Sequence, residues 1–187
     1  MAAVLLLVDI QKGLDDPKFG ARNNPDAEQK AGALLAHWRA ANAPVIHVQH
    51  MSAEPDSPLR PGLPGNALKP EVAPGAGETV IRKDVNSAFI GTDLLNRLRD
   101  MDATDLVICG LTTPHCVSTT ARMAANLGFN VELAEDACAA FAASADMSWK
   151  PGADAPSPEM IHDLAVAHIS GEFVTVVSTE TLLGRLP

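Results

Sequence analysis

Residues 3–9 read AVLLLVD, and this stretch decides how the chain folds. Six apolar residues in a row, closed by an aspartate, are typical of a short strand that is buried on both faces of a sheet. Residues 105–110, DLVICG, repeat the pattern, and residues at helical spacing follow each run. Buried strands that alternate with helices predict right-handed βαβ units and a mostly parallel sheet with helices on both faces.

The rest of the chain continues this alternation. We expect further strands at 44–49, 79–82, 130–134 and 173–177, and helices that begin near residues 25, 92, 114 and 158, with a short one after 177. Asn24-Pro25 and Ser157-Pro158 each pair a capping residue with a proline at the first helical position. The length of 187 residues is little more than one domain, and no linker divides it. The sequence therefore predicts a single α/β domain over residues 1–187, built as a three-layer α/β/α sandwich.

Composition limits the partners that the chain could have. The 14 Lys and Arg residues stand against 23 Asp and Glu, which gives a formal net charge of −9. No basic run exists, so we expect neither nucleic acid nor an anionic membrane as a partner. The N-terminus lacks the positive segment and cleavage pattern of a signal peptide, and no apolar run approaches the ~18 residues that span a bilayer. We expect a cytoplasmic protein that acts on a small molecule.

Three chemically useful side chains follow the predicted strands. Asp9 follows the first strand, Lys83 the third, and Cys116 lies in the turn after the fourth. Ligands of open α/β sheets bind beyond the carboxyl ends of the strands, so these residues share one edge. Burial raises the pKa of a carboxylate toward that of a useful base, and a neighbouring lysine favours a thiolate. The spacing therefore predicts a site built from Asp9, Lys83 and Cys116.

Position separates the three cysteines. Cys109 lies inside an apolar strand and Cys138 follows another, and both are typical of packing. Cys116 comes after Thr113 and Pro114, which suit a helix start, so free backbone amides and the helix dipole should lower its pKa. The same amides could bind an oxyanion. A small packed residue at this turn is the alternative interpretation.

The sequence indicates neither a metal nor a cofactor. His47 and His50 are three residues apart on a strand, so they point to opposite faces, and no C-x-x-C or H-x-H pair accompanies them. No glycine-rich phosphate motif follows a strand, which excludes the usual dinucleotide enzymes and P-loop NTPases. His115 neighbours Cys116 but faces another way, so we expect it to shape the pocket.

Several motifs together resemble one family. They are Asp9-Ile10-Gln11, Lys83 with Ser87-Ala88-Phe89 and Gly91-Thr92-Asp93-Leu94, Gly110-Leu111-Thr112-Thr113-Pro114-His115-Cys116-Val117, and Asp136-Ala137. The chain is identified by them as similar to the isochorismatase-like cysteine hydrolases, which include nicotinamidases and N-carbamoylsarcosine amidohydrolases. The resemblance implies six strands in the order 3-2-1-4-5-6, an Asp9–Lys83–Cys116 triad and a homodimer or homotetramer, in which a neighbouring subunit could complete the pocket.

The same resemblance implies details of the pocket. The backbone amides of Thr112 and Cys116 would form the oxyanion hole, beside a non-proline cis peptide at Leu111–Thr112. Gln11, Phe89 and His115 would line the substrate pocket, with the loops at 51–78 and near Trp149 as walls or lids.

Departures from the family pattern refine the expected activity. Nicotinamidases carry an Asp-x-His metal cluster where this chain reads His47-Val48-Gln49-His50, so we expect neither zinc nor nicotinamide. Cys116 favours hydrolysis of a C–N bond through a thioester over the vinyl-ether cleavage of true isochorismatases, which lack this cysteine. Two alternatives stay open: an isochorismatase-type vinyl-ether hydrolase, and a redox or binding protein that uses Cys116 without hydrolysis.

Overall fold

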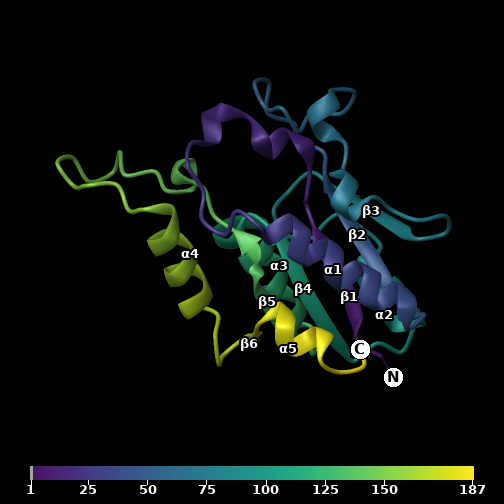
Figure 1. Ribbon diagram of the computed structural model, residues 1–187. Coiled ribbons are helices and arrows are strands. Elements are labelled where there is room, and N and C mark those ends of the chain that lie inside the picture. Colours follow the sequence, from purple (N-terminus) through teal and green to yellow (C-terminus); the bar gives the residue numbers. More distant parts are fainter. Residues whose placement is uncertain (1) are drawn as a thin grey trace.

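A six-stranded parallel sheet forms the centre of residues 2–187, which the computed structural model describes (Figure 1). Its strands are β1 (Val4–Val8), β2 (Val45–His50), β3 (Thr79–Lys83), β4 (Asp105–Leu111), β5 (Asn130–Ala139) and β6 (Thr175–Val177). They lie in the order β3-β2-β1-β4-β5-β6, and every neighbouring pair is parallel. The predicted α/β class and strand order are confirmed.

Strands β1 and β4 lie at the centre of the strand order, and both of their faces are covered. Every residue of β1 is buried, and Leu6 pairs in register with Ile108 of β4. One glycine is required here: Gly110 has φ +136°, and a Cβ atom on it would lie 2.0 Å from the Val8 carbonyl oxygen. No other residue fits this backbone approach, which places the turn after β4 directly beside the end of β1.

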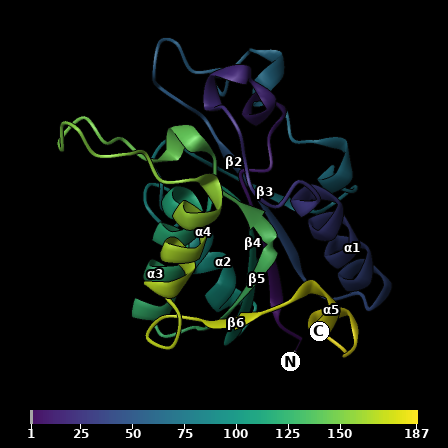
Figure 2. The same cartoon turned by 60° about the vertical axis from the view of Figure 1, so that its left-hand side comes forward.

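The helices form two layers, one on each face of the sheet (Figure 2). They are α1 (Ala27–Ala40), α2 (Leu94–Asp100), α3 (Ser118–Asn126), α4 (Pro158–Ala167) and α5 (Thr179–Leu183). Helices α1 and α5 cover one face, and α2, α3 and α4 lie on the other. The predicted helical spacing is confirmed in α1, where Leu34, Leu35 and Trp38 are buried. The indole of Trp38 also donates a hydrogen bond of 2.7 Å to the carbonyl of Ala3, which fixes α1 to the start of the sheet.

Helix α1 begins later than its sequence signal predicts. Asn24 takes a left-handed conformation with φ +40°, and its side chain donates to the carbonyls of Glu135 and Cys138. The helix therefore starts at Ala27, with Asp26 at the N-cap position but without a capping hydrogen bond from its side chain. The side chain of Asn24, which was expected to cap the helix, instead binds strand β5. Because β5 is distant in the sequence, the local pattern does not reveal this contact.

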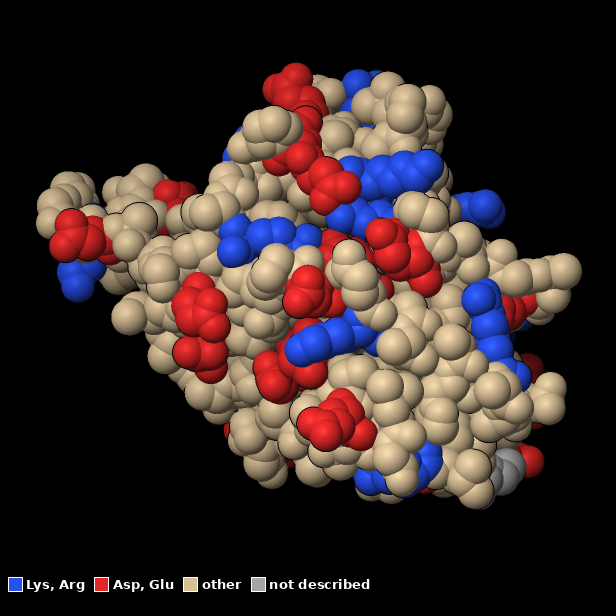
Figure 3. All heavy atoms as spheres, in the orientation of Figure 1, with Lys and Arg blue, Asp and Glu red and all other residues tan. Residues whose placement is uncertain are grey.

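Long irregular segments stand at the carboxyl ends of the strands, in the upper part of Figure 1. Buried Lys69 ties the segment after β2 to the rest by pairing with Asp15 at 2.5 Å and with Glu28 of α1 at 2.7 Å. On the face that Figure 3 draws, Lys and Arg side chains lie scattered among acidic ones instead of forming a continuous basic surface. Among residues 2–187, no helix is long and apolar enough to cross a membrane.

Candidate active site

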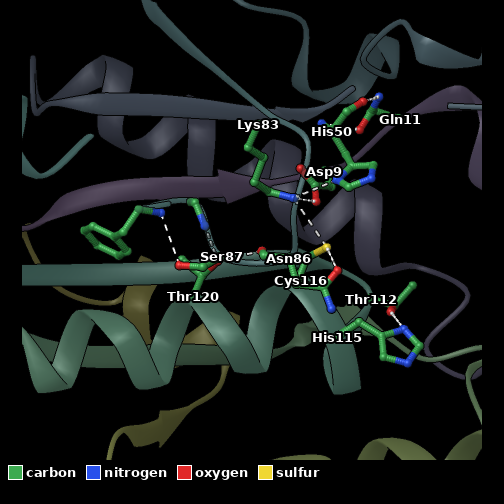
Figure 4. Close-up of polar contacts among 12 residues, drawn as sticks. Asp9, Gln11, His50, Lys83, Asn86, Ser87, Thr112, His115, Cys116 and Thr120 are labelled. Atoms are coloured by element: carbon green, nitrogen blue, oxygen red, sulfur yellow. Dashed lines mark hydrogen bonds and ion pairs between the residues drawn. The ribbon is translucent and has the colours of Figure 1, made fainter. Parts of the chain in front are cut away.

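The predicted site residues meet at the carboxyl edge of the sheet (Figure 4). Asp9 directly follows β1, Lys83 ends β3, and Cys116 lies in a π-helical turn, Thr113–Val117, after β4. Asp9 has φ +52°, a left-handed conformation that aspartate adopts more readily than most residues. The strand order therefore brings together three residues that are up to 107 positions apart in the sequence.

Lys83 is the centre of this site. Its Nζ lies 2.5 Å from Asp9 Oδ2, 3.1 Å from His50 Nδ1 and 3.4 Å from Cys116 Sγ. Asp9 and Lys83 are 2% and 3% exposed, whereas Cys116 is half-buried. A buried ion pair is thus in contact with a half-buried thiol.

Cys116 holds its proton in this arrangement. Burial and then the negative charge of Asp9 raise the pKa of the Cys116 thiol to about 12, and the charge of Lys83 opposes this rise. Lys83 lowers the pKa of Cys116 as expected, but burial and the charge of Asp9 outweigh it, so the expected net lowering is not found. The predicted helix start is present, but its first turn, Thr113–Val117, is π-helical and continues into α3 at Ser118. A thiol in this state needs a base before it can act as a nucleophile.

Asp9 is placed to be that base. Burial raises the pKa of its carboxyl, against the lowering effect of Lys83. Oδ2 accepts the bond from Lys83, while the buried Oδ1 has no hydrogen-bond partner among the described residues. The ligand atoms of Asp9 and Cys116 lie within 4.8 Å of one another. A buried carboxylate within this distance of a protonated thiol is placed for proton transfer.

The turn around Cys116 is shaped by its backbone. The Leu111–Thr112 peptide is cis, and the carbonyl of Thr112 accepts bonds from the amides of His115 and Val117 at 3.1 and 3.3 Å. The hydroxyl of Thr112 lies 3.1 Å from His115 Nδ1. The oxyanion role of the Thr112 and Cys116 amides stays a prediction.

Asn86 is a neighbour of the thiol that sequence reasoning missed. Cys116 Sγ lies 3.6 Å from Asn86 Oδ1. The loop of Asn86 is held against α3, because Thr120 Oγ1 accepts from the amide of Ala88 at 3.1 Å and donates to the carbonyl of Asn86 at 3.4 Å. The K-x-x-N spacing after Lys83 was the available signal, but a lone exposed asparagine has no distinguishing pattern.

The three predicted pocket residues lie in different surroundings. Gln11 is fully buried, and its amide binds the backbone of His50 and Asn66, so it supports the site from behind instead of lining a pocket. Phe89 is 9% exposed and stacks on Phe129, with 6.2 Å between the ring centroids. His115 is exposed within the turn Thr113–Val117 that carries Cys116. Of the three, His115 is the one with an open face toward solvent next to Cys116.

The segments expected as walls differ as well. Asn66, in the segment after β2, donates to the carbonyls of His50 and Leu59, so this segment packs onto the site. Trp149 is 74% exposed. The loop that precedes α4 projects away from the sheet in both ribbon views (Figures 1 and 2). A groove of about 640 Å³ lies elsewhere, between α3 and α4.

A resident metal does not fit this donor set. Atoms of Asp9, His50 and Cys116 gather within 4.8 Å of one another, but the ammonium of Lys83 is within hydrogen-bond distance of all three. That ammonium already supplies the positive charge that a cation would bring. His47 points elsewhere, toward Glu78, with 2.8 Å between Nε2 and Oε2.

Comparisons with known proteins agree with this fold. The model of the isochorismatase domain matches residues 3–181. Protein YrdC of Bacillus subtilis, an isochorismatase family protein, is 43% identical over 179 residues, which cover 96% of this chain and 93% of YrdC. A streptothricin hydrolase of Streptomyces noursei is 34% identical over 176 residues, which cover 92% of this chain and 67% of that protein. The crystal structure of an isochorismatase-family protein from Chromobacterium violaceum has a TM-score of 0.91 and 45% identity, and the match covers 98% of this chain and 92% of that chain.

Proposed function

Because the chain belongs to the isochorismatase family of hydrolases, we propose that it hydrolyses a C–N bond of a small amide or ureido compound through a cysteine thioester. One observation carries the proposal: the Cys116 thiol lies 3.4 Å from a lysine that pairs with a buried aspartate at 2.5 Å. A nucleophile, a base and a fixed positive charge are the parts that covalent hydrolysis needs. The name of the streptothricin hydrolase relative supports hydrolysis of a small molecule.

Acylation is the first half of the proposed reaction. Asp9 takes the thiol proton as Sγ attacks the carbonyl carbon and forms the C–S bond. The carbonyl π electrons move to oxygen, where the amides of Thr112 and Cys116 hold the oxyanion. When the carbonyl re-forms, the C–N bond breaks and Asp9 passes its proton to the leaving nitrogen. The products are a free amine or ammonia and a thioester on Cys116.

Deacylation reverses the roles with water as the nucleophile. Asp9 removes a proton from water, which attacks the thioester carbon, and the oxyanion hole is used again. The C–S bond then breaks, and the sulfur recovers its proton from Asp9. Lys83 balances the carboxylate charge in the resting state and the thiolate charge while the proton resides on Asp9. A nitrogen leaving group suits this site, because it must be protonated and Asp9 holds a proton at that moment.

The test is a panel of primary amides and ureido compounds, assayed by release of ammonia and by intact mass. We expect Cys116→Ala to abolish turnover, and the wild type to show a mass increase equal to the acyl group. Cys138→Ala is the matched control, because this cysteine is 0% exposed and lies outside the site. Full turnover by Cys116→Ala would overturn the mechanism.

The two alternatives give different outcomes in the same experiments. A redox role needs a resolving cysteine, but Cys109 and Cys138 are each 0% exposed. A stable sulfenate or disulfide at Cys116 without any acyl adduct would favour that alternative. Turnover of isochorismate without turnover of any amide would favour vinyl-ether hydrolysis.

A further inference from the structure

The ammonium of Lys83 has one acceptor for each of its three N–H groups. They are Asp9 Oδ2 at 2.5 Å, His50 Nδ1 at 3.1 Å and Cys116 Sγ at 3.4 Å. An ammonium donates and cannot accept, so His50 Nδ1 must be the acceptor in its contact. The ring proton of His50 therefore lies on Nε2, and the imidazole is the neutral partner in a cluster with two ions (Figure 4).

The surroundings of His50 keep this ring neutral. Burial and then the positive charge of Lys83 lower the pKa of His50 to about 4, against the opposing effects of the Asp84 carboxylate and a hydrogen bond with the backbone of Val85. At neutral pH the ring can thus accept a bond from Lys83 without adding charge. Asp9 then remains the single negative charge in contact with the ammonium.

The backbone of His50 is held in place by buried amides. The Gln11 side chain accepts from the His50 amide at 2.8 Å and donates to its carbonyl at 3.0 Å. Asn66 donates to the same carbonyl at 2.9 Å. In the sheet, His50 of β2 also stands in register with Lys83 of β3. The buried Gln11, whose sequence position suggested a pocket residue, thus fixes the residue that contacts the lysine.

We propose that His50 is a positioning residue, whose Nδ1 holds the third N–H of Lys83 and keeps the ammonium aimed at both Asp9 and Cys116. The role rests on the proposed cysteine chemistry, because it acts by stabilising the Cys116 thiolate through Lys83. The charges around position 50 explain why a neutral histidine suits it better than an acidic residue. A carboxylate at this place would compete with Asp9 for the ammonium and would oppose ionisation of the thiol, whereas a neutral imidazole supplies an acceptor only.

Three substitutions of His50 separate this role from simple packing. In His50→Asn, Oδ1 takes the place of Nδ1 and can accept from Lys83. In His50→Gln, the polar end reaches the region of Nε2, and in His50→Ala no acceptor remains. The readout is the rate at which iodoacetamide alkylates Cys116 between about pH 7 and 9, followed by peptide mass, because the thiolate is the species that reacts.

We expect alkylation to be slower by roughly 3- to 10-fold in His50→Ala and His50→Gln, and within about 2-fold of wild type in His50→Asn. His168→Ala is the matched control, because that histidine is exposed at the end of α4. Thermal unfolding establishes that each variant is folded. His50→Asp is a further variant, expected to react more slowly than His50→Asn because it adds a negative charge.

Equal rates in all His50 variants would overturn the proposal, and so would equal slowing by Asn, Gln and Ala. These outcomes are independent of the proposed hydrolysis, since alkylation requires no substrate. If no amide is hydrolysed but the Asn variant alone keeps the wild-type rate, the proposed activity fails and the role of His50 stands. If amides are hydrolysed but the alkylation rate of Cys116 is the same in all His50 variants, only the inference about His50 fails.

Discussion

Replacing Asp9 by asparagine should change two properties of Cys116 in opposite directions. The asparagine keeps the shape of the side chain and tolerates the left-handed backbone with φ +52°. It removes the negative charge that raises the pKa of Cys116, and it removes the base that takes the thiol proton. The thiol should therefore ionise more easily in the free protein, while hydrolysis should nearly stop.

The size of the first effect follows from the geometry. The ligand atoms of Asp9 and Cys116 lie within 4.8 Å, where two unit charges interact by about 3.5 kcal/mol at an effective dielectric constant of about 20. Since 1.36 kcal/mol corresponds to one pKa unit, Asp9→Asn should lower the pKa of Cys116 from about 12 by about 2.5. The thiolate fraction rises ~300-fold, its intrinsic nucleophilicity falls ~10-fold, and alkylation near neutral pH becomes roughly 30-fold faster.

The second effect is measured on the same variant. Loss of the general base should lower amide turnover by at least ~10²-fold. Iodoacetamide alkylation of Cys116 and ammonia release therefore move in opposite directions. Asp102→Asn is the matched control. Asp102 has φ +51° and is exposed in the turn after α2, so the same substitution is made in the same backbone conformation but away from Cys116.

Two results would refute this reasoning. Alkylation that is unchanged or slower in Asp9→Asn would mean that the charge of Asp9 does not suppress the thiolate. Amide turnover within a few-fold of wild type would mean that another group takes the proton. A general loss of structure is distinguished from both by thermal unfolding of Asp9→Asn beside Asp102→Asn.

Two further predictions concern stability. Arg39 holds the pKa of Glu78 down at about 2, so Glu78 stabilises the fold above its ordinary pKa near 4.5 and loses this contribution as the pH falls toward 2. In urea unfolding, Glu78→Gln should cost about 1–3 kcal/mol at pH 7 and roughly half as much or less near pH 3, and a difference that stays constant with pH would contradict this linkage. Gly110→Ala should cost more than about 3 kcal/mol, because its Cβ would meet the Val8 carbonyl at 2.0 Å. Gly128→Ala should cost only about 1 kcal/mol, because that site has φ +97° and open space, and equal losses would contradict the clash.

The strand and helix pattern could be predicted because it depends on neighbouring residues. The apolar run of β1 identifies a strand buried on both faces, whatever packs on it. By contrast, β5 continues to Ala139, five residues beyond its apolar signal at 130–134. It pairs with β4 across a register shift, and Gly110 stands opposite Cys138 after it. The second half of β5 is a strand because it pairs with β4, which the local sequence does not show. The polar residues Glu135 and Asp136 interrupt the apolar pattern, so the sequence predicts that the strand ends before them.

The sequence by itself determined that Asp9, Lys83 and Cys116 lie at one edge of a parallel sheet, because each follows a strand and parallel strands end together. Only the tertiary structure decided what these groups do to one another. Burial and the charge of Asp9 outweigh Lys83 and keep the Cys116 thiol protonated. The roles of His50 and Gln11 are set by contacts across 33 and 39 positions. Electrostatic effects depend on distance and burial, and these quantities exist only once the chain is folded.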